Sequence, residues 1–249
     1  MEIELKENER IDDLEYKGLK IIQNETGFCF GIDSILLSDF AKNLKKNSKV
    51  ADFGTGTGII SILLAKKSEA KEIYGIEIQD DVAEMAQRSV KLNHLEDKIR
   101  ILNIDLRKLD LEYGNRYFDV VVTNPPYKKV GTGLLNEDEK KLISRHEIKC
   151  SLEDLIKQAF IVLKDKGEFY MVHRSDRMVD VLCCMREYKI EPKELRLIYS
   201  NKNSEKSKLF LIKGIKNGNI ELKLHDPLYI YNEDGTYTDQ ILEIYGKKK

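Results

Sequence analysis

An Asn-Pro-Pro-Tyr tetrad follows the apolar run FDVVVT, and its residue types suit chemistry on a planar amino group. The Asn124 side-chain oxygen and the Pro125 carbonyl can accept the two hydrogens of such a group, while Tyr127 can stack on the ring that carries it. Two acceptors that draw these hydrogens out of the ring plane favour the pyramidal nitrogen of the transition state. We therefore predict a catalytic loop for transfer to an amine, with no metal ion required, made of Asn124, Pro125, Pro126 and Tyr127.

A glycine-rich loop in the segment VADFGTGTG is the second candidate site. Its glycines, Gly54, Gly56 and Gly58, allow a sharp turn and leave room for a ligand close to the backbone. The dinucleotide fingerprint G-x-G-x-x-G is excluded because Ile59 stands at its third glycine, and no Gly-Lys-Ser/Thr of a P-loop follows. Asp52, just before the loop, would repel a pyrophosphate and suits a cationic or amino-bearing ligand.

Acidic residues also end the next two strand-like runs. Glu77 in YGIEI can accept both hydroxyls of a ribose, and Asp105 in NIDL can accept from the exocyclic amine of an adenine. The alternative for each is a carboxylate that only caps the end of a strand. Adenine and ribose contacts without a phosphate-binding loop fit S-adenosyl-L-methionine, whose methyl sulfonium is a strong electrophile. We predict as its binding residues Asp52, Gly54, Gly56, Gly58, Glu77 and Asp105.

Short β-branched runs alternate with longer amphipathic runs from residue 49 onward, and these elements must position the candidate residues. Strict alternation favours a mostly parallel sheet that helices cover on both faces. The expected strands are 49–53, 73–77, 99–103, 117–123 and 167–173, and the expected helices are 59–67, 81–93, 152–163 and 175–188. Strand-like runs at 194–200, 208–215 and 220–224, with an Asn-Gly turn before the last, predict an antiparallel edge.

The composition excludes several classes of protein. The chain has 249 residues, 41% of them hydrophobic and 34% charged, which is typical of a folded chain with a polar surface. No apolar run approaches the ~20 residues of a membrane-spanning helix, and the charged start MEIELKENER is unlike a secretion signal. The cysteines, Cys29, Cys150, Cys183 and Cys184, form no CxxC pair and are expected to be reduced. We expect a cytoplasmic protein with neither a membrane partner nor a metal site.

Charge favours a nucleic-acid partner only locally, because the formal net charge of the whole chain is -1. Between Lys189 and Lys223, nine Lys and Arg residues stand against four Glu residues. Lys202 and Lys206 fall in the polar loop NKNSEKS of this region, Lys208 directly follows it, and all three are candidate substrate-binding residues. Such residues can neutralise phosphates, and the alternative is an ordinary solvated face.

A long connection, residues 128–149, directly follows the tetrad. Connections of this length in a compact domain are often lids or substrate loops. Arg145 and His146 in this loop are candidate contacts to phosphate, and Glu147 could instead cap the next helix.

Together, the segments DFGTGTG, IEI, NIDL and NPPY resemble the class I S-adenosylmethionine-dependent methyltransferases that act on amino groups. GFCFGIDSILLSDFAK, the triplet RHE, HRSDR and the tail HDPLYIYNEDGTYTDQILEIYG are similar to a bacterial family that methylates adenine N6 in the anticodon loop of a valine tRNA. The resemblance covers nearly the whole chain. It implies a Rossmann-like α/β fold with a mostly parallel, seven-stranded sheet and an antiparallel edge, S-adenosyl-L-methionine as cofactor and tRNA as partner.

The same resemblance implies roles for residues in the amino-terminal segment. Gly31, Asp33 and Ser34 would flank the methionine end of the cofactor. The alternative reading of residues 27–42 is an ordinary helix that carries Ile35, Leu36 and Phe40 into the core. Both readings can hold together, since one face of a helix can touch a ligand while the other packs.

Several functions stay open at this point. Guanine-N2 methyltransferases of RNA and glutamine-N5 methyltransferases of proteins share the tetrad, and a non-catalytic RNA-binding module would keep the fold without the reaction. We expect one methyltransferase domain over residues 1–249, as a monomer or weak homodimer. Its parts would be an amino-terminal segment on the cofactor site (1–48), a cofactor and catalytic core (49–188), and carboxyl-terminal strands with a basic region (189–249).

Overall fold

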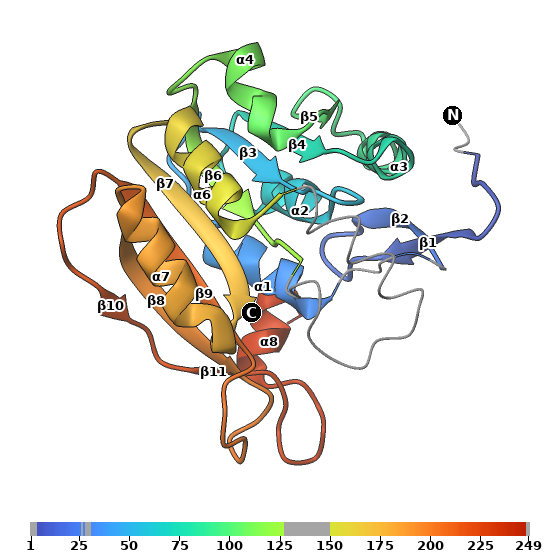
Figure 1. Ribbon diagram of the computed structural model, residues 1–249. Coiled ribbons are helices and arrows are strands. Elements are labelled where there is room, and N and C mark those ends of the chain that lie inside the picture. Colours follow the sequence, from blue (N-terminus) through green and yellow to red (C-terminus); the bar gives the residue numbers. More distant parts are fainter. Residues whose placement is uncertain (1–3, 26, 28–30, 127–149, 248–249) are drawn as a thin grey trace, which may run out of the picture.

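A large twisted β-sheet organises the protein, whose computed structural model describes residues 4–25, 27, 31–126 and 150–247 (Figure 1). From one edge to the other its strands are β10 (Lys223–Leu224), β8 (Ile190–Tyr199), β9 (Leu209–Lys216), β7 (Leu163–Arg174), β6 (Phe118–Thr123), β3 (Lys49–Phe53), β4 (Glu72–Glu77) and β5 (Ile99–Asn103). The two-residue strand β11 (Leu228–Tyr229) also pairs with β8. Seven longer strands thus form the body of the sheet, as the resemblance implied.

The strands run parallel except for β9, which is antiparallel to both of its neighbours, β7 and β8. The predicted antiparallel strand therefore exists, but it lies two positions inside the sheet, behind β10 and β8. The last strand-like run, expected at 220–224, is reduced to the two residues of β10, and these pair with β8 in parallel. Because β9 is antiparallel to both neighbours, β8 runs in the same direction as β7. The carboxyl end of β8 therefore lies on the same side of the sheet as the carboxyl ends of β6 and β7.

Helices cover both faces of the sheet (Figure 1). They are α1 (Ile32–Phe40), α2 (Ile59–Lys67), α3 (Asp80–Leu92), α4 (Leu109–Tyr113), α6 (Leu152–Val162), α7 (Met178–Glu187) and α8 (Asp239–Ile244). One core cluster joins α1, α2 and α8 to one face, and a second joins α4, α6 and α7 to the other. Apolar strands such as FDVVVT are buried on both sides for this reason, which explains their unbroken hydrophobic run.

Local signals in the sequence set several of these boundaries. β3, α2 and β5 begin and end at the expected residues. Helix α6 begins after Ser151, whose hydroxyl accepts from the Asp154 amide while the Asp154 carboxylate accepts from the Ser151 amide. This capping box satisfies two backbone groups that the first turn leaves free. The helix expected at 175–188 begins as a 3-10 turn, Ser175–Arg177, before α7.

An antiparallel hairpin of β1 (Glu9–Asp13) and β2 (Lys20–Asn24) precedes the main sheet and was not anticipated from the sequence. It packs on α3, where the Ile22 amide donates to the Ser89 hydroxyl at 3.0 Å. The Arg88 guanidinium binds both carboxylate oxygens of Glu9, at 2.7 and 2.6 Å. This charged fork fixes the hairpin on α3.

Within the described ranges, no helix is long and apolar enough to cross a membrane. The same residues contain no group of three or more His, Cys, Asp or Glu side chains that could hold a metal ion. The cysteines in these ranges, Cys150, Cys183 and Cys184, are free thiols.

Gly75 in β4 marks a point where strand and loop approach too closely for a side chain. A Cβ at this position would lie 2.7 Å from the Ile101 Cδ1 atom and 2.9 Å from the Thr55 hydroxyl. We expect Gly75→Ala to lower the free energy of unfolding by about 1–3 kcal/mol, because overpacking must displace these neighbours. Chemical denaturation measures this. Gly27→Ala, where the nearest atom is at 3.4 Å, is the matched control, and equal stability of the two variants would contradict the packing argument.

Candidate active site

The carboxyl ends of β3, β4, β5 and β6 meet at one edge of the sheet, and the candidate residues follow them directly. Phe53 and Thr123 are paired in register at the ends of β3 and β6. The Thr123 hydroxyl also donates to the Phe53 carbonyl at 3.0 Å. The glycine loop and the Asn-Pro-Pro segment therefore leave the sheet side by side, at the position where open α/β sheets bind their ligands.

The glycine loop needs its glycines for backbone geometry. Gly54, Gly56 and Gly58 have φ angles of +67°, +57° and +92°, which other residues rarely adopt. A Cβ at Gly54 or Gly56 would meet no atom within 4 Å, so the space over this part of the loop is open. At Gly58 it would lie 3.6 Å from the Ala86 Cβ atom, so this glycine packs against α3. Open space for a ligand therefore lies over Gly54 and Gly56, and not over Gly58.

Asp52 lies beneath the loop and is completely buried. Its Oδ2 atom accepts from the Thr55 hydroxyl at 2.6 Å, the Ser61 hydroxyl at 2.8 Å and the Ser61 amide at 3.2 Å. Its Oδ1 atom is buried without a hydrogen-bond partner among the described residues. Burial raises the pKa of the Asp52 carboxyl to about 6, against these hydrogen bonds, which lower it. The structure describes a carboxylate that holds the loop to α2, and its direct contact with a ligand stays a prediction.

Glu77 at the end of β4 is only 3% exposed and also contacts the loop. Its Oε2 atom accepts from the Gly56 amide at 3.1 Å, and its Oε1 atom accepts from the Gln79 amide at 3.0 Å. The Asn103 side chain donates to the Glu77 carbonyl at 3.1 Å. The Gln79 side-chain amide also donates to Oε1 at 3.3 Å, so these contacts orient the group and leave acceptor capacity for a hydroxyl on Oε2.

Asp105 follows β5 and begins a short 3-10 helix, where it accepts from the Arg107 amide at 3.0 Å. The Arg107 guanidinium binds the same carboxylate through its Nε atom at 3.0 Å, and this pair keeps the pKa of Asp105 below its ordinary value. The carboxylate is ionised and fixed at the predicted edge of the site. An adenine amine that approached it would share the group with Arg107.

Asn124 comes directly after β6, and its Nδ2 atom donates to the Ser34 hydroxyl at 3.0 Å. Pro125 is half-buried and Pro126 is exposed. Gly31, Asp33 and Ser34 stand at the start of α1, where the Ser34 amide donates to the Asp33 carboxylate at 2.9 Å. The structure thus brings the start of α1 to the catalytic loop. Tyr127, Arg145 and His146 lie outside the described residues.

Three residues at this edge were not predicted from the sequence. Thr55 and Ser61 hold Asp52, and a serine inside the apolar run IISILLA was the available signal. His173 is the next-to-last residue of β7, the neighbour of β6, and burial lowers its pKa to about 4. Its Nδ1 atom accepts from the Arg174 amide at 2.9 Å, so the neutral ring carries its proton on Nε2.

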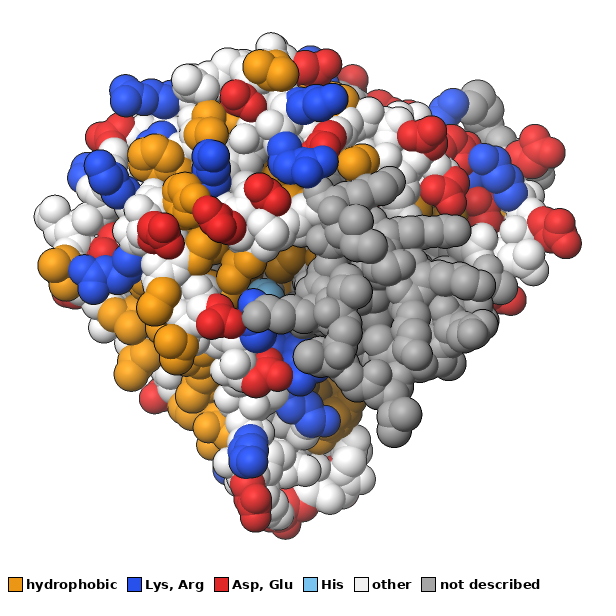
Figure 2. Space-filling model, in the orientation of Figure 1, with side chains coloured by type: hydrophobic (Ala, Val, Ile, Leu, Met, Phe, Trp, Pro, Cys, Tyr) orange, Lys and Arg blue, Asp and Glu red, His pale blue; other side chains and the backbone are white. Residues whose placement is uncertain are grey.

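The predicted substrate-binding lysines, Lys202, Lys206 and Lys208, are exposed on the loop between β8 and β9. The Ser207 and Ser175 hydroxyls, 2.7 Å apart, tie this loop to the turn after β7. It therefore belongs to the same edge of the sheet as Asn124. Basic and acidic side chains are interspersed on the face shown in Figure 2, so positive charge is local there.

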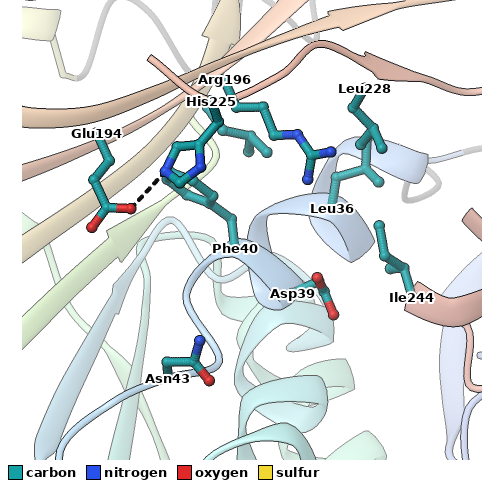
Figure 3. A pocket seen from close by; sticks show the side chains of 10 residues that line it. Leu36, Asp39, Phe40, Asn43, Glu194, Arg196, His225, Leu228 and Ile244 are labelled. Atoms are coloured by element: carbon teal, nitrogen blue, oxygen red, sulfur yellow. Dashed lines mark hydrogen bonds and ion pairs between the residues drawn. The ribbon is translucent and has the colours of Figure 1, made fainter. Parts of the chain in front are cut away.

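A cavity of about 170 Å³ lies elsewhere, between α1, β8 and α8. Arg196 and Asp39 extend into it from opposite sides, and the Glu194 carboxylate accepts from the His225 Nε2 atom at 2.7 Å (Figure 3). None of its lining residues belongs to the glycine loop or to the Asn-Pro-Pro segment. It therefore lies apart from the candidate active site.

The raised pKa of Asp52 predicts a pH dependence of stability. The unfolded carboxyl loses its proton near its ordinary value of 3.8, whereas the folded one keeps it up to about 6. Between these values the folded state binds more protons than the unfolded state. The stabilisation that comes from the Asp52 proton is therefore present below pH 4 and is lost as the pH rises through 6. The loss is on the order of 2–3 kcal/mol. Denaturation of the wild type and of Asp52→Asn over this range measures it, and a difference between them that does not change with pH would contradict it.

Comparisons with known proteins agree with this architecture. The family model described as "Methyltransferase small domain" matches residues 31–188. Among solved structures, a predicted O-methyltransferase of Agrobacterium tumefaciens has a TM-score of 0.69 at 21% identity, over 87% of this chain and 97% of that one. M. jannaschii TYW2, in complex with AdoMet, has a TM-score of 0.57 at 17% identity, over 86% and 88%. These structures show that the fold is that of a Rossmann-like class I methyltransferase, as predicted.

The names of the curated relatives are more specific about the reaction. A Porphyromonas gingivalis protein named tRNA1(Val) (adenine(37)-N6)-methyltransferase is 31% identical over 72% of this chain and 71% of its own length. Proteins of the same name from Flavobacterium johnsoniae and Haemophilus influenzae are 23% and 25% identical, each over 92% of this chain and over 96% and 94% of their own. The family resemblance is confirmed. This chain belongs to the methyltransferase small domain family, together with the tRNA1(Val) (adenine(37)-N6)-methyltransferases that match it.

Proposed function

We propose that this protein is an enzyme that transfers the methyl group of S-adenosyl-L-methionine to N6 of an adenine in the anticodon loop of a valine tRNA. The observation that carries the proposal is the position of Asn124, which leaves the end of β6 beside the glycine loop at the end of β3. The names of the curated relatives supply the substrate. A tRNA substrate would place the enzyme in the cytoplasm.

The residues at the edge of the sheet fit the cofactor. The open space over Gly54 and Gly56 accommodates a ligand against the backbone, and Glu77 is fixed next to it with acceptor capacity for a ribose hydroxyl. Asp105 lies at the end of the next strand for the adenine amine. Gly31, Asp33 and Ser34 would flank the methionine end, and Asp52 would act through the loop that it holds. When bound there, S-adenosylmethionine supplies an electrophilic methyl group.

The protein's own contribution to the reaction is to present acceptors to the target amine. The Asn124 side-chain oxygen and the Pro125 carbonyl would accept the two N6 hydrogens and favour the pyramidal nitrogen whose lone pair attacks. Tyr127 would stack on the adenine. The preceding residue Thr123 is fixed to β3, which keeps this acceptor pair in one position relative to the cofactor loop.

The RNA backbone would contact the loop between β8 and β9. In the described part of the chain, Lys202, Lys206 and Lys208 make no ion pair, whereas Lys213 binds Glu168 and Glu194. Lys216 is buried and donates to backbone carbonyls. This loop therefore offers three lysines to phosphates, and we propose that Arg145 and His146 add to them.

Removal of the Asn124 acceptor tests the reaction. We expect Asn124→Ala to reduce kcat on unmodified tRNA by about 10²–10³-fold, because one preorganised polar contact to the transition state is lost. The measurement is methyl transfer from labelled S-adenosylmethionine, with nucleoside analysis of the product. Asn43→Ala, in the cavity between α1 and β8, is the matched control and should keep wild-type activity. N2-methylguanosine, methylated protein, or no product from the wild type would each contradict the proposal.

Charge reversal tests the RNA interface. We expect K202E/K206E to weaken tRNA binding and to lower the slope of log Kd against log salt by about 2, since two phosphate contacts are lost. Filter binding over a salt series measures this. The control K45E/K46E makes the same charge change just before β3. This position is at the amino-terminal end of that strand, opposite the strand ends that carry the candidate active site. Equal effects of the two double variants would show a nonspecific charge effect and exclude this loop as the interface.

A further inference from the structure

The contact between Asn124 and Ser34 joins two segments that are 90 residues apart, at the start of α1 and the end of β6. We propose that Ser34 is a positioning residue for the methyl transfer, which fixes the side-chain amide of Asn124 with its oxygen toward the target amine. This role differs from the contact with the cofactor that the family resemblance implied for Ser34. It rests on the proposed function, because an acceptor has to be presented only if the substrate is an amine.

The need for such a residue follows from the chemistry of an amide. One end of the Asn124 side chain is an acceptor and the other carries two N–H donors, and a rotation of the group by half a turn exchanges them. With the donors outward, the amide would face the N–H groups of the substrate and repel them. In the structure the Ser34 hydroxyl accepts an Nδ2 hydrogen at 3.0 Å, so the nitrogen end of the amide faces α1 and Oδ1 is its opposite end.

Ser34 is itself held firmly enough for this role. It is 4% exposed and lies in the first turn of α1, where its amide donates to the Asp33 carboxylate. The next residues, Ile35, Leu36 and Leu37, are buried in the core. A serine hydroxyl fixed on a packed helix loses little further entropy when it binds the amide. Asn124 is held as well, since the hydroxyl of the preceding residue, Thr123, donates to the Phe53 carbonyl.

Kinetics separate this role from a contact with the cofactor. We expect Ser34→Ala to lower kcat about five- to tenfold, the value of one neutral hydrogen bond, while the Kd for S-adenosylmethionine changes less than about twofold. The matched control is Ser38→Ala, which removes a buried hydroxyl on the same helix that donates to the Ile35 carbonyl. A tenfold weaker Kd with unchanged kcat, or an equal loss of kcat in Ser38→Ala, would overturn the proposal.

A second variant uses the symmetry of a carboxylate. Asp at position 124 has two equivalent acceptor oxygens and needs no orientation, so Ser34→Ala should cost less than about twofold in the Asn124→Asp background. If Ser34→Ala costs the same in both backgrounds, Ser34 supports the loop in general and does not orient an amide.

A spectroscopic readout keeps this test independent of the substrate. The side-chain NH2 signals of Asn124, assigned by their loss in Asn124→Asp, report the hydrogen bond to Ser34 without any RNA. We expect the bonded proton to move upfield and to become more temperature-dependent in Ser34→Ala, and to stay unchanged in Ser38→Ala. Unchanged signals in Ser34→Ala would overturn the proposal. If instead these signals respond but no tRNA is methylated, the proposed function fails and the positioning contact stands.

Discussion

The buried carboxylate of Asp52 is the interaction on which the active-site edge depends. It gathers donors from Thr55 and Ser61 at one oxygen and so ties the glycine loop to the first turn of α2. This anchor adds to the backbone hydrogen bond from the Thr55 amide to the Ile76 carbonyl, at 3.0 Å, in holding the left-handed backbone at Gly54 and Gly56. The loop in turn donates to Glu77 through the Gly56 amide, so one enclosed charge orders the contacts of the neighbouring strand.

A second constraint connects that loop to the chemistry. β3 and β6 are neighbours in the sheet although long stretches of chain separate them in sequence, and the Thr123 hydroxyl bonds to the Phe53 carbonyl at their ends. Asn124 therefore lies beside the loop, and α1 reaches it from the other side through Ser34. The cofactor loop, the acceptor and the residue that orients the acceptor are each fixed by a different element of the fold.

Much of this arrangement could be predicted from the sequence, because it rests on local patterns. Alternating apolar runs and glycine turns give β3, α2 and β5 within their observed limits. The β1–β2 hairpin and the inner position of β9 depend on contacts between distant segments, which no local pattern encodes. The contact of Ser34 with Asn124 is of the same kind. The count of basic residues between Lys189 and Lys223 also overstates the charge that a partner could bind. Lys213 pairs with Glu168, and Lys216 donates to a backbone carbonyl within the fold.

The most direct test of the account is a crystal structure of the protein with a non-reactive S-adenosylmethionine analogue and an unmodified anticodon stem-loop of valine tRNA. The account predicts the analogue over Gly54 and Gly56, with its ribose on Glu77. It also predicts an extruded adenine whose N6 atom lies about 3 Å from the Asn124 Oδ1 atom and the Pro125 carbonyl. An analogue bound in the cavity beside Arg196, or a target amine that contacts neither acceptor, would contradict it.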